Sequence, residues 1–345
     1  MSQSLRQIAA VPARVVAQAP ARIHLGFLDP SASLGRHFAS LGLVIGDFGT
    51  CVEVQPASIN EVVVHDSRDP RLAQRLGQML ARLQGETAAG HPLRVVLHRA
   101  APAHCGLGSG TQLALALGSA FADAHGLKLD SRSLAAMLGR GERSGIGIAG
   151  FEHGGLLLDG GPGADGRPAP LLARAEFPAE WRVILVMDES RHGLHGGAEH
   201  RAMANLPPFA TQRAAAMCHQ VLMKILPAAI EGEFEPFAEG VSEIQRELGA
   251  YFAHAQGGSM FTSPAVAHAL EWIGARYTAG IGQSSWGPTG FAFVESAARA
   301  SEVLDAARAA GVVAGELRAL VTGGRNRGGE REFVQPTASA RNGRR

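Results

Sequence analysis

The chain has 345 residues, enough for one large or two smaller domains, and its 46% hydrophobic and 18% charged residues are ordinary for a globular protein. A net charge of +1 argues against a nucleic-acid-binding surface, and no window approaches the roughly eighteen apolar residues of a membrane-spanning helix. The basic residues are almost all arginine, so we expect any cationic site to bind phosphate or carboxylate through guanidinium groups.

The three cysteines, Cys51, Cys105 and Cys218, lie far apart in the sequence. This spacing offers neither a disulfide framework nor a CxxC site. The first twenty residues contain no continuous apolar segment, so we predict no signal peptide. We therefore expect a cytoplasmic protein with no membrane partner.

Short segments that contain Val and Ile predict strands in the first half of the chain. They lie near 14–17, 20–25, 40–46, 51–56 and 61–65, and at 93–99. Residues 69–84 have helical spacing, which places one set of apolar side chains on a single face: Leu72, Leu76, Met79, Leu80 and Leu83. Further helices are expected at 111–125 and 131–141, and a short buried strand at 154–161.

A turn-rich stretch at 162–178 suggests a domain boundary. Beyond it we expect strands at 181–188, 278–283, 290–295 and 315–321, and helices at about 209–230, 233–254, 264–276 and 298–310. We therefore divide the chain into an N-terminal domain at 14–175 and a C-terminal domain at 176–322. The Gly- and Arg-rich tail at 323–345 has few apolar residues and is predicted to be disordered.

Residues 21–46, ARIHLGFLDPSASLGRHFASLGLVIG, place a few charged or titratable side chains among small and apolar ones. The set comprises Arg22, His24, Asp29, Arg36 and His37. A solvated loop rarely keeps so many apolar residues around so few charges, so we expect these side chains to turn inward toward a ligand. The alternative is a hairpin with an internal Asp29–Arg36 ion pair.

The segment 102–118, PAHCGLGSGTQLALALG, joins the strand at 93–99 to a helix through a glycine-rich loop. Its glycines let backbone N–H groups converge on an anion, and the helix adds the positive end of its dipole. The alternative is a tight turn that simply needs glycine. The loop is neither a Walker A nor a dinucleotide-binding sequence. We predict a phosphate site formed by Gly106, Leu107, Gly108, Ser109, Gly110 and Thr111.

The stretch 187–207 carries His192, His195, Glu199 and His200 among glycines. Their spacing matches no helical zinc motif such as HExxH, so zinc is the less favoured interpretation. The glycines indicate a loop, and a polar loop with glycine hinges is typical of a lid that closes over a ligand.

The stretch 280–295, GIGQSSWGPTGFAFVE, offers the hydroxyls of Ser284, Ser285 and Thr289 and the aromatic face of Trp286. A tryptophan between Ser285 and Gly287 is unusual for a core residue. We therefore expect this loop to contact substrate, whereas the alternative is a hairpin turn whose tryptophan belongs to the core.

The run P-x-x-x-G-L-G-S at 102–109 resembles the phosphate-loop motif of the GHMP kinase superfamily, and the loop near 280–290 resembles its C-terminal motif. This resemblance implies an α+β fold, with an N-terminal domain like the second domain of ribosomal protein S5 and a ferredoxin-like C-terminal domain. Kinases of the superfamily commonly carry P-S-G-x-D after the phosphate loop, whereas RSGIG stands at 143–147 here. Gly147 replaces the aspartate that supports phosphoryl transfer, which implies phosphate binding without the kinase reaction.

Four further segments are similar to β-ribofuranosylaminobenzene 5′-phosphate synthases: ARIHLGFLD at 21–29, SLGR at 33–36, SLGLVI at 40–45 and GQSSWGPTGF at 282–291. The similarity covers most of residues 20–322. It implies transfer of a phosphoribosyl group from phosphoribosyl pyrophosphate to 4-aminobenzoate or a hydroxybenzoate, with release of CO₂ and pyrophosphate, in tetrahydromethanopterin biosynthesis. It also implies Mg²⁺ and a homodimer. An ATP-dependent small-molecule kinase and a catalytically silent phosphometabolite-binding protein remain the alternatives.

For that reaction we expect Arg22 and Arg36 to bind a phosphate or the benzoate carboxylate. Asp29 would stabilise positive charge at C1 of the ribose or hold Mg²⁺ through water. His24 would donate a hydrogen bond to a phosphate, and Trp286 would stack on the aromatic ring.

Overall fold

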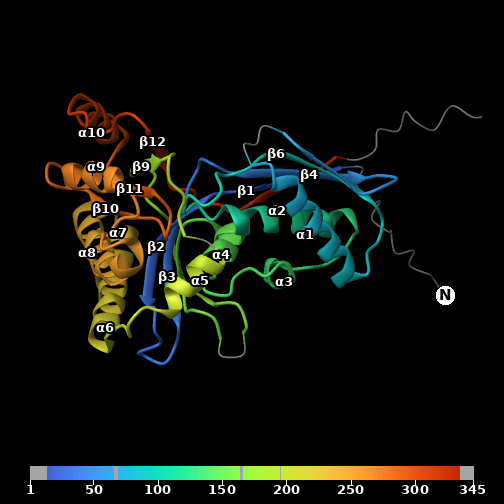
Figure 1. The fold of residues 1–345 in the computed structure, drawn as a ribbon, viewed down its shortest axis with the longest axis horizontal. Coiled ribbons are helices and arrows are strands. Elements are labelled where there is room, and N and C mark those ends of the chain that lie inside the picture. The colour runs from blue at the N-terminus through green and yellow to red at the C-terminus, as the bar shows by residue number, and fades with distance from the viewer. Residues whose placement is uncertain (1–13, 66–68, 164–165, 195, 335–345) are drawn as a thin grey trace, which may run out of the picture.

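The computed structural model describes residues 14–65, 69–163, 166–194 and 196–334. Its strands form three sheets, and β2 and β3 stand between an N-terminal and a C-terminal group of elements (Figure 1). The expected α+β fold is confirmed.

The N-terminal part is a five-stranded sheet with helices on one face (Figure 1). In sheet order its strands are β13 (Glu330–Val334), β1 (Arg14–Ala19), β4 (Thr50–Pro56), β6 (Leu93–Arg99) and β5 (Glu61–Val64). The helices are α1 (Leu72–Thr87), α2 (Ser109–Ala124), α3 (Ser131–Met137) and α4 (Ile146–His153). The predicted apolar face of α1 is buried as expected. Helix α2 is buried almost all round, because its Ala, Gly and Ser residues let the sheet and its neighbouring helices approach closely.

The second sheet is antiparallel and contains β2 (Arg22–Asp29), β3 (Phe38–Val44), β7 (Leu156–Asp159) and β8 (Leu171–Ala175). One apolar cluster combines Ile23 and Leu25 of β2 with Leu185 of the C-terminal sheet and Phe237 of a C-terminal helix. Strand β2 is therefore fixed by packing from both parts of the chain.

The third sheet, in the order β10 (Gly280–Gln283), β11 (Thr289–Val294), β9 (Arg182–Asp188) and β12 (Leu317–Gly323), is antiparallel. Side chains of β9 alternate between two cores, as strand geometry requires. One face packs against α9 (Pro264–Gly274) and α10 (Ala297–Ala309). The other face packs against α6 (Thr211–Gln220), α7 (Leu226–Glu231) and α8 (Phe234–Phe252), with the π-helical turn η1 (Val221–Ile225) and the 3₁₀ turn η2 (Ala253–Gln256) continuing these helices.

The predicted disorder of the tail is wrong for residues 323–334. Strand β13 pairs antiparallel with β1, from Arg14 opposite Val334 to Gln18 opposite Glu330. The Asn326 side chain exchanges two hydrogen bonds with the backbone of Phe177, at 2.8 and 2.9 Å. Composition did not reveal this segment because backbone pairing requires few apolar side chains. The rest of the tail, 335–345, lies outside the described residues, and the division of the chain near residue 175 stays a prediction.

The predicted loop at 187–207 is also partly wrong, since Gly196–Ala204 forms helix α5. Its Glu199 is held by Arg143 at 2.6 Å, which anchors the helix to the loop before α4. Among the described residues, no helix is both long and apolar enough to cross a membrane.

Candidate functional site

The glycine-rich loop makes a sharp turn immediately before α2. Gly106 and Gly108 have φ angles of 80° and 72°, a region that L side chains rarely adopt. A Cβ on Gly106 would lie 2.2 Å from the Ser284 carbonyl oxygen, and one on Gly108 2.9 Å from the guanidinium carbon of Arg22. Both positions therefore require glycine.

The first turn of α2, Ser109–Thr111, lines a cleft of about 1050 Å³. We call it the phosphate cleft. The first N–H groups of a helix have no partner within the helix, and they attract anions together with the helix dipole.

Five arginines line the phosphate cleft: Arg22, Arg71, Arg75, Arg140 and Arg143. Nη1 of Arg22 donates to the Gly106 carbonyl at 3.1 Å, and burial lowers the Arg22 pKa to about 10. Burial and the nearby charge of Arg75 also lower the pKa of Arg140, which lies against Gly110. Nε of Arg22 and Nε of Arg140 are buried without a partner among the described residues. Such unpaired cationic donors beside a glycine loop are suited to bind phosphate oxygens.

His24 lies at the edge of this cleft because β2 contains a bulge between His24 and Gly26. Gly26 has φ 124° and a Cβ there would lie 2.0 Å from Leu248, so only glycine allows the bulge. The Gly26 N–H donates to Nδ1 of His24 at 3.1 Å, which leaves the imidazole proton on Nε2. Burial, with the charges of Arg22 and Arg143, lowers the His24 pKa to about 3, so the ring is neutral at pH 7. Nε2 has no partner among the described residues.

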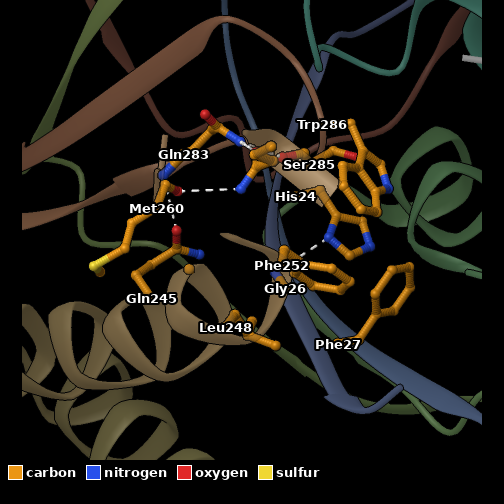
Figure 2. Close-up of a pocket in the computed structure, with 12 residues that line it drawn as sticks. His24, Gly26, Phe27, Gln245, Leu248, Phe252, Met260, Gln283, Ser285 and Trp286 are labelled. Carbon is orange, nitrogen blue, oxygen red and sulfur yellow. Dashed lines mark hydrogen bonds between the residues drawn. The ribbon is translucent and has the colours of Figure 1, made fainter. Parts of the chain in front are cut away.

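A second cavity, the aromatic pocket, shares lining residues with the phosphate cleft. Figure 2 shows the side chains that line this pocket. His24 and Phe27 meet edge to face at 4.7 Å, and Trp286 meets Phe252 edge to face at 4.8 Å. The remaining wall consists of Gly26, Gln245, Leu248, Gly249, Gln256, Met260, Gln283 and Ser285. This lining is mostly apolar and aromatic, but the cavity has a volume of about 40 Å³, so it must widen to admit an aromatic ring.

The glutamine amides of the aromatic pocket are engaged with the protein itself. Gln245 Oε1 accepts from the Gln283 backbone at 2.8 Å, and Gln283 Nε2 donates to Gln256 Oε1, also at 2.8 Å. Three residues, His24, Phe27 and Ser285, line both cavities, so a ligand in the pocket would meet a ligand in the cleft at this shared wall.

Ser284 ties the two glycine-rich loops together. Its hydroxyl donates to the Gly106 carbonyl at 2.7 Å and accepts from the backbone N–H of His24 at 2.9 Å. A Cβ on Gly287 would lie 2.4 Å from the Cys105 carbonyl carbon, which shows how closely the loops pack. Ser284 is fully buried and therefore positions the loop and His24.

Comparison with known proteins supports a family assignment. The GHMP kinases N terminal domain model matches residues 72–155, and the GHMP kinases C terminal model matches residues 225–313. The β-ribofuranosylphenol 5′-phosphate synthase of Archaeoglobus fulgidus is 34% identical over 329 residues, covering 91% of this chain and 98% of that protein. The enzyme of the same name from Methanothermobacter thermautotrophicus is 29% identical over 330 residues, covering 91% and 97%.

The chain belongs to the β-ribofuranosylphenol 5′-phosphate synthase family. It is an enzyme of the pentosyltransferase type. The mevalonate diphosphate decarboxylase structure from Staphylococcus aureus aligns with a TM-score of 0.65 at 12% identity, over 93% of this chain and 98% of that chain. This likeness confirms the GHMP fold.

Most of the site residues predicted from the sequence line one or both of the two cavities. They are Arg22, His24, Gly106, Gly108, Ser109, Gly110, Thr111, Ser285 and Trp286. Two others point elsewhere. The Leu107 side chain belongs to the core, although its carbonyl accepts from the Arg22 N–H at 3.2 Å. Thr289 is fully buried in β11. Trp286 is only 5% exposed, so it is both a core residue and a wall of the aromatic pocket.

Asp29 and Arg36 lie outside both cavities. The Asp29 carboxylate accepts hydrogen bonds from the Leu34 N–H at 2.7 Å, the Ser33 hydroxyl at 3.2 Å and the Ser31 N–H at 3.3 Å. Arg36 donates to the carbonyls of Gly160 and Gly161. Each side chain therefore stabilises the turn after β2. The alternative ion pair between Asp29 and Arg36 is not formed. Their positions give no support to the predicted catalytic roles.

The sequence did not lead us to predict four of the arginines that line the phosphate cleft: Arg71, Arg75, Arg140 and Arg143. Arg140 stands in LGRG between Gly139 and Gly141, whose φ angles are 62° and 87°. The sequence did contain a pattern that could have identified Arg140 as a site residue, namely an arginine between two glycines in the turn after a helix.

The zinc alternative for 187–207 gains no support. His192, Glu199 and His200 line the phosphate cleft, but the described part of the chain holds no group of three or more His, Cys, Asp or Glu placed for a metal. His195 lies outside the described residues.

At residue 147, where the resemblance to GHMP kinases places an aspartate, this chain has glycine. Gly147 sits in α4 against the start of α2, and a Cβ there would lie 2.8 Å from the Thr111 methyl group. An aspartate at 147 would require Thr111 to move.

Proposed function

We propose that this protein transfers the 5-phosphoribosyl group of phosphoribosyl pyrophosphate to an aromatic acid, with release of pyrophosphate and CO₂. The observation that carries the proposal is the wall shared by the phosphate cleft and the aromatic pocket. A phosphorylated donor in the cleft and an aromatic acceptor in the pocket would meet at His24, Phe27 and Ser285. A kinase site would instead need an acceptor-activating group, and Gly147 stands at that place.

The acceptor we favour is 4-hydroxybenzoate, with 4-aminobenzoate as the second candidate. The names of the relatives describe a ribofuranosylphenol phosphate, which is the product expected when the acceptor carries a hydroxyl group. The apolar lining of the aromatic pocket does not favour one of these rings over the other, because they differ only in one polar substituent.

In the proposed reaction, the bond between ribose C1 and pyrophosphate breaks and positive charge develops on C1. The ring carbon that bears the carboxylate attacks C1 and forms a carbon–carbon bond. CO₂ then leaves that carbon, and its bonding electron pair restores the aromatic ring, so no base is required. The α2 N-terminus, Arg22 and Arg140 are placed to stabilise the departing pyrophosphate. Phe27 and Trp286 would exclude water that would otherwise capture the cation.

Mg²⁺ belongs to the proposal as an ion carried mainly by the pyrophosphate oxygens. Asp29 does not fit a metal, because three protein donors already occupy its carboxylate. The cleft offers separate carboxylates such as Glu142, and Mg²⁺ is often bound by one or two carboxylates together with substrate phosphates. When bound, it would neutralise charge on the leaving group. A homodimer, a cytoplasmic location and a place in tetrahydromethanopterin biosynthesis complete the proposal.

The proposal is tested with acceptors labelled in the carboxyl group. Purified protein receives Mg²⁺ and labelled 4-hydroxybenzoate or 4-aminobenzoate, with and without phosphoribosyl pyrophosphate. We expect donor-dependent release of labelled CO₂ in equal amount to pyrophosphate. Donor binding without CO₂ release would favour the silent binding protein, and ADP formation from ATP with an alcohol acceptor would favour the kinase.

A further inference from the structure

We propose that His24 binds the carboxylate of the aromatic acid through its Nε2–H, at the point where CO₂ leaves. This inference rests on the proposed function and assigns a substrate group to one residue. It starts from an unusual side chain: His24 is 3% exposed, and its Nε2 has no partner among the described residues. A buried donor left unpaired destabilises a protein, and a ligand that accepts its hydrogen bond removes that penalty.

The direction of the donor is fixed by the strand. The Gly26 N–H occupies Nδ1, so the bulge in β2 turns Nε2–H away from the strand backbone. Figure 2 shows the imidazole between Trp286 and Phe27, at the edge of the aromatic pocket. Because His24 also lines the phosphate cleft, Nε2–H lies at the border between the two cavities.

The chemistry places the carboxylate at the same border. The ring carbon that attacks C1 also carries the carboxylate, so this group must stand where the aromatic pocket opens toward the ribose. The opposite end of the ring, with the hydroxyl or amino group, then points into the pocket. Among the residues lining the aromatic pocket, His24 has the one buried side-chain donor without a protein partner. The exposed Ser285 hydroxyl lies at the same border and can provide a second hydrogen bond.

The phosphates of the donor have other partners. Arg22, Arg140 and the first turn of α2 lie on the cleft side, and they carry the charge that a pyrophosphate requires. A neutral imidazole adds little there. At the carboxylate, however, a neutral donor has an advantage. CO₂ leaves without charge, so a cation bound tightly to the carboxylate would stabilise the reactant more than the transition state.

Two substitutions separate this role from a structural one. In His24→Asn, the side-chain oxygen stands near the place of Nδ1 and can still accept from the Gly26 N–H, but nothing reaches the place of Nε2. In His24→Gln, the longer side chain carries an N–H donor to that place. If His24 is only structural, His24→Asn should keep more activity than His24→Gln. If His24 binds the carboxylate, His24→Gln should keep more activity than His24→Asn.

The readout is steady-state CO₂ release with the two substrates varied in turn. We expect His24→Asn to raise the KM for 4-hydroxybenzoate about ten- to hundredfold, as for the loss of a hydrogen bond to a charged group, while the KM for phosphoribosyl pyrophosphate changes less than about threefold. His24→Gln should recover most of the loss. A raised KM for the donor with an unchanged KM for the acceptor would overturn the assignment, as would better activity in Asn than in Gln.

Equilibrium binding keeps this inference separable from the proposed function. Calorimetry without the donor compares 4-hydroxybenzoate with its methyl ester, first on the wild type and then on His24→Asn. We expect the wild type to prefer the acid about tenfold or more and the variant to lose this preference. Equal affinities on the wild type would exclude a carboxylate site even if the variant fails to fold. A wild type that binds the acid but releases no CO₂ would instead contradict the proposed reaction and leave the site in place.

Discussion

Arg22 and His24 are two residues apart on β2, so their side chains point to the same side of the sheet. The strand thereby supplies one charged donor and one neutral donor to adjoining positions. Arg22 keeps its proton because its pKa falls only to about 10, whereas the pKa of His24 falls from 6.5 to about 3. Burial lowers the pKa of both side chains, and the charges of Arg22 and Arg143 lower that of His24 further, so Arg22 is a cation and His24 is neutral at pH 7.

The neutral state of His24 makes stability depend on pH. In the unfolded chain His24 takes up a proton below its reference pKa of 6.5, whereas in the folded protein it does so only below about 3. The unfolded state therefore binds more protons between these values, and stability falls as the pH is lowered through this window. For this residue we expect a loss of about 2 kcal/mol between pH 7 and pH 5.

Urea unfolding at the two pH values measures this effect, with His24→Asn as the matched control. The variant has no imidazole at position 24 to take up the proton. Between pH 7 and pH 5 its free energy of unfolding should therefore fall about 2 kcal/mol less than that of the wild type. Equal pH dependence in the two proteins would show that His24 titrates normally in the folded state.

Two arginines provide a matched test of the phosphate cleft. Arg140→Ala removes a guanidinium whose Nε lacks a partner among the described residues, and it should raise the KM for phosphoribosyl pyrophosphate about tenfold or more. Arg36→Ala removes a guanidinium that binds the carbonyls of Gly160 and Gly161 outside the cleft. It should leave this KM within about threefold. The reverse order of effects would restore the catalytic role that the sequence suggested for Arg36.

At the scale of elements, the N-terminal sheet is completed by the far end of the chain. Strand β13 pairs with β1, and Arg331 also binds Asp123 of α2 at 2.9 Å. Gly329 packs against the Phe151 ring of α4. The segment therefore holds α2 and α4 against the sheet, and these two helices carry the phosphate loop and Gly147.

Truncation tests this dependence. A chain that ends at 323 lacks β13 and leaves the outer edge of β1 unpaired, whereas a chain that ends at 334 keeps every described strand. We expect the shorter chain to unfold at a temperature at least about 4 °C lower, which corresponds to roughly 3 kcal/mol in a protein of this size. Equal melting temperatures would mean that the strand contributes nothing to stability.

At the scale of the whole molecule, periodicity and loop composition predicted most elements, because a buried face imposes its spacing on the sequence. The glycine loop was predictable for the same kind of reason, since Gly106 and Gly108 need φ angles that other residues avoid. The orientation of the Asp29 and Arg36 side chains, away from both cavities, was not predictable from the sequence. It depends on a turn whose backbone groups satisfy both side chains, and no spacing rule reveals such local partners.

The contact between the two cavities was equally hidden from the sequence, because it joins β2 near the start of the chain to the 284–287 loop near its end. Ser284 makes that connection with two hydrogen bonds. The arrangement has a functional consequence in the proposed reaction. The aromatic pocket closes one side of the cleft, so a defect in the pocket should admit water to the cation formed in the cleft.

Trp286→Phe tests this coupling, with Trp272→Phe as the control. Trp286 packs on Phe252 in the pocket wall, whereas Trp272 packs on Arg276 and Tyr277 away from both cavities. The smaller ring at 286 leaves a gap beside the acceptor. We expect pyrophosphate release to exceed CO₂ release in this variant, because water captures part of the phosphoribosyl cation, while the control keeps the two products equal. Equal products in both variants, at lowered rate in Trp286→Phe, would show that the tryptophan orients the acceptor without excluding water.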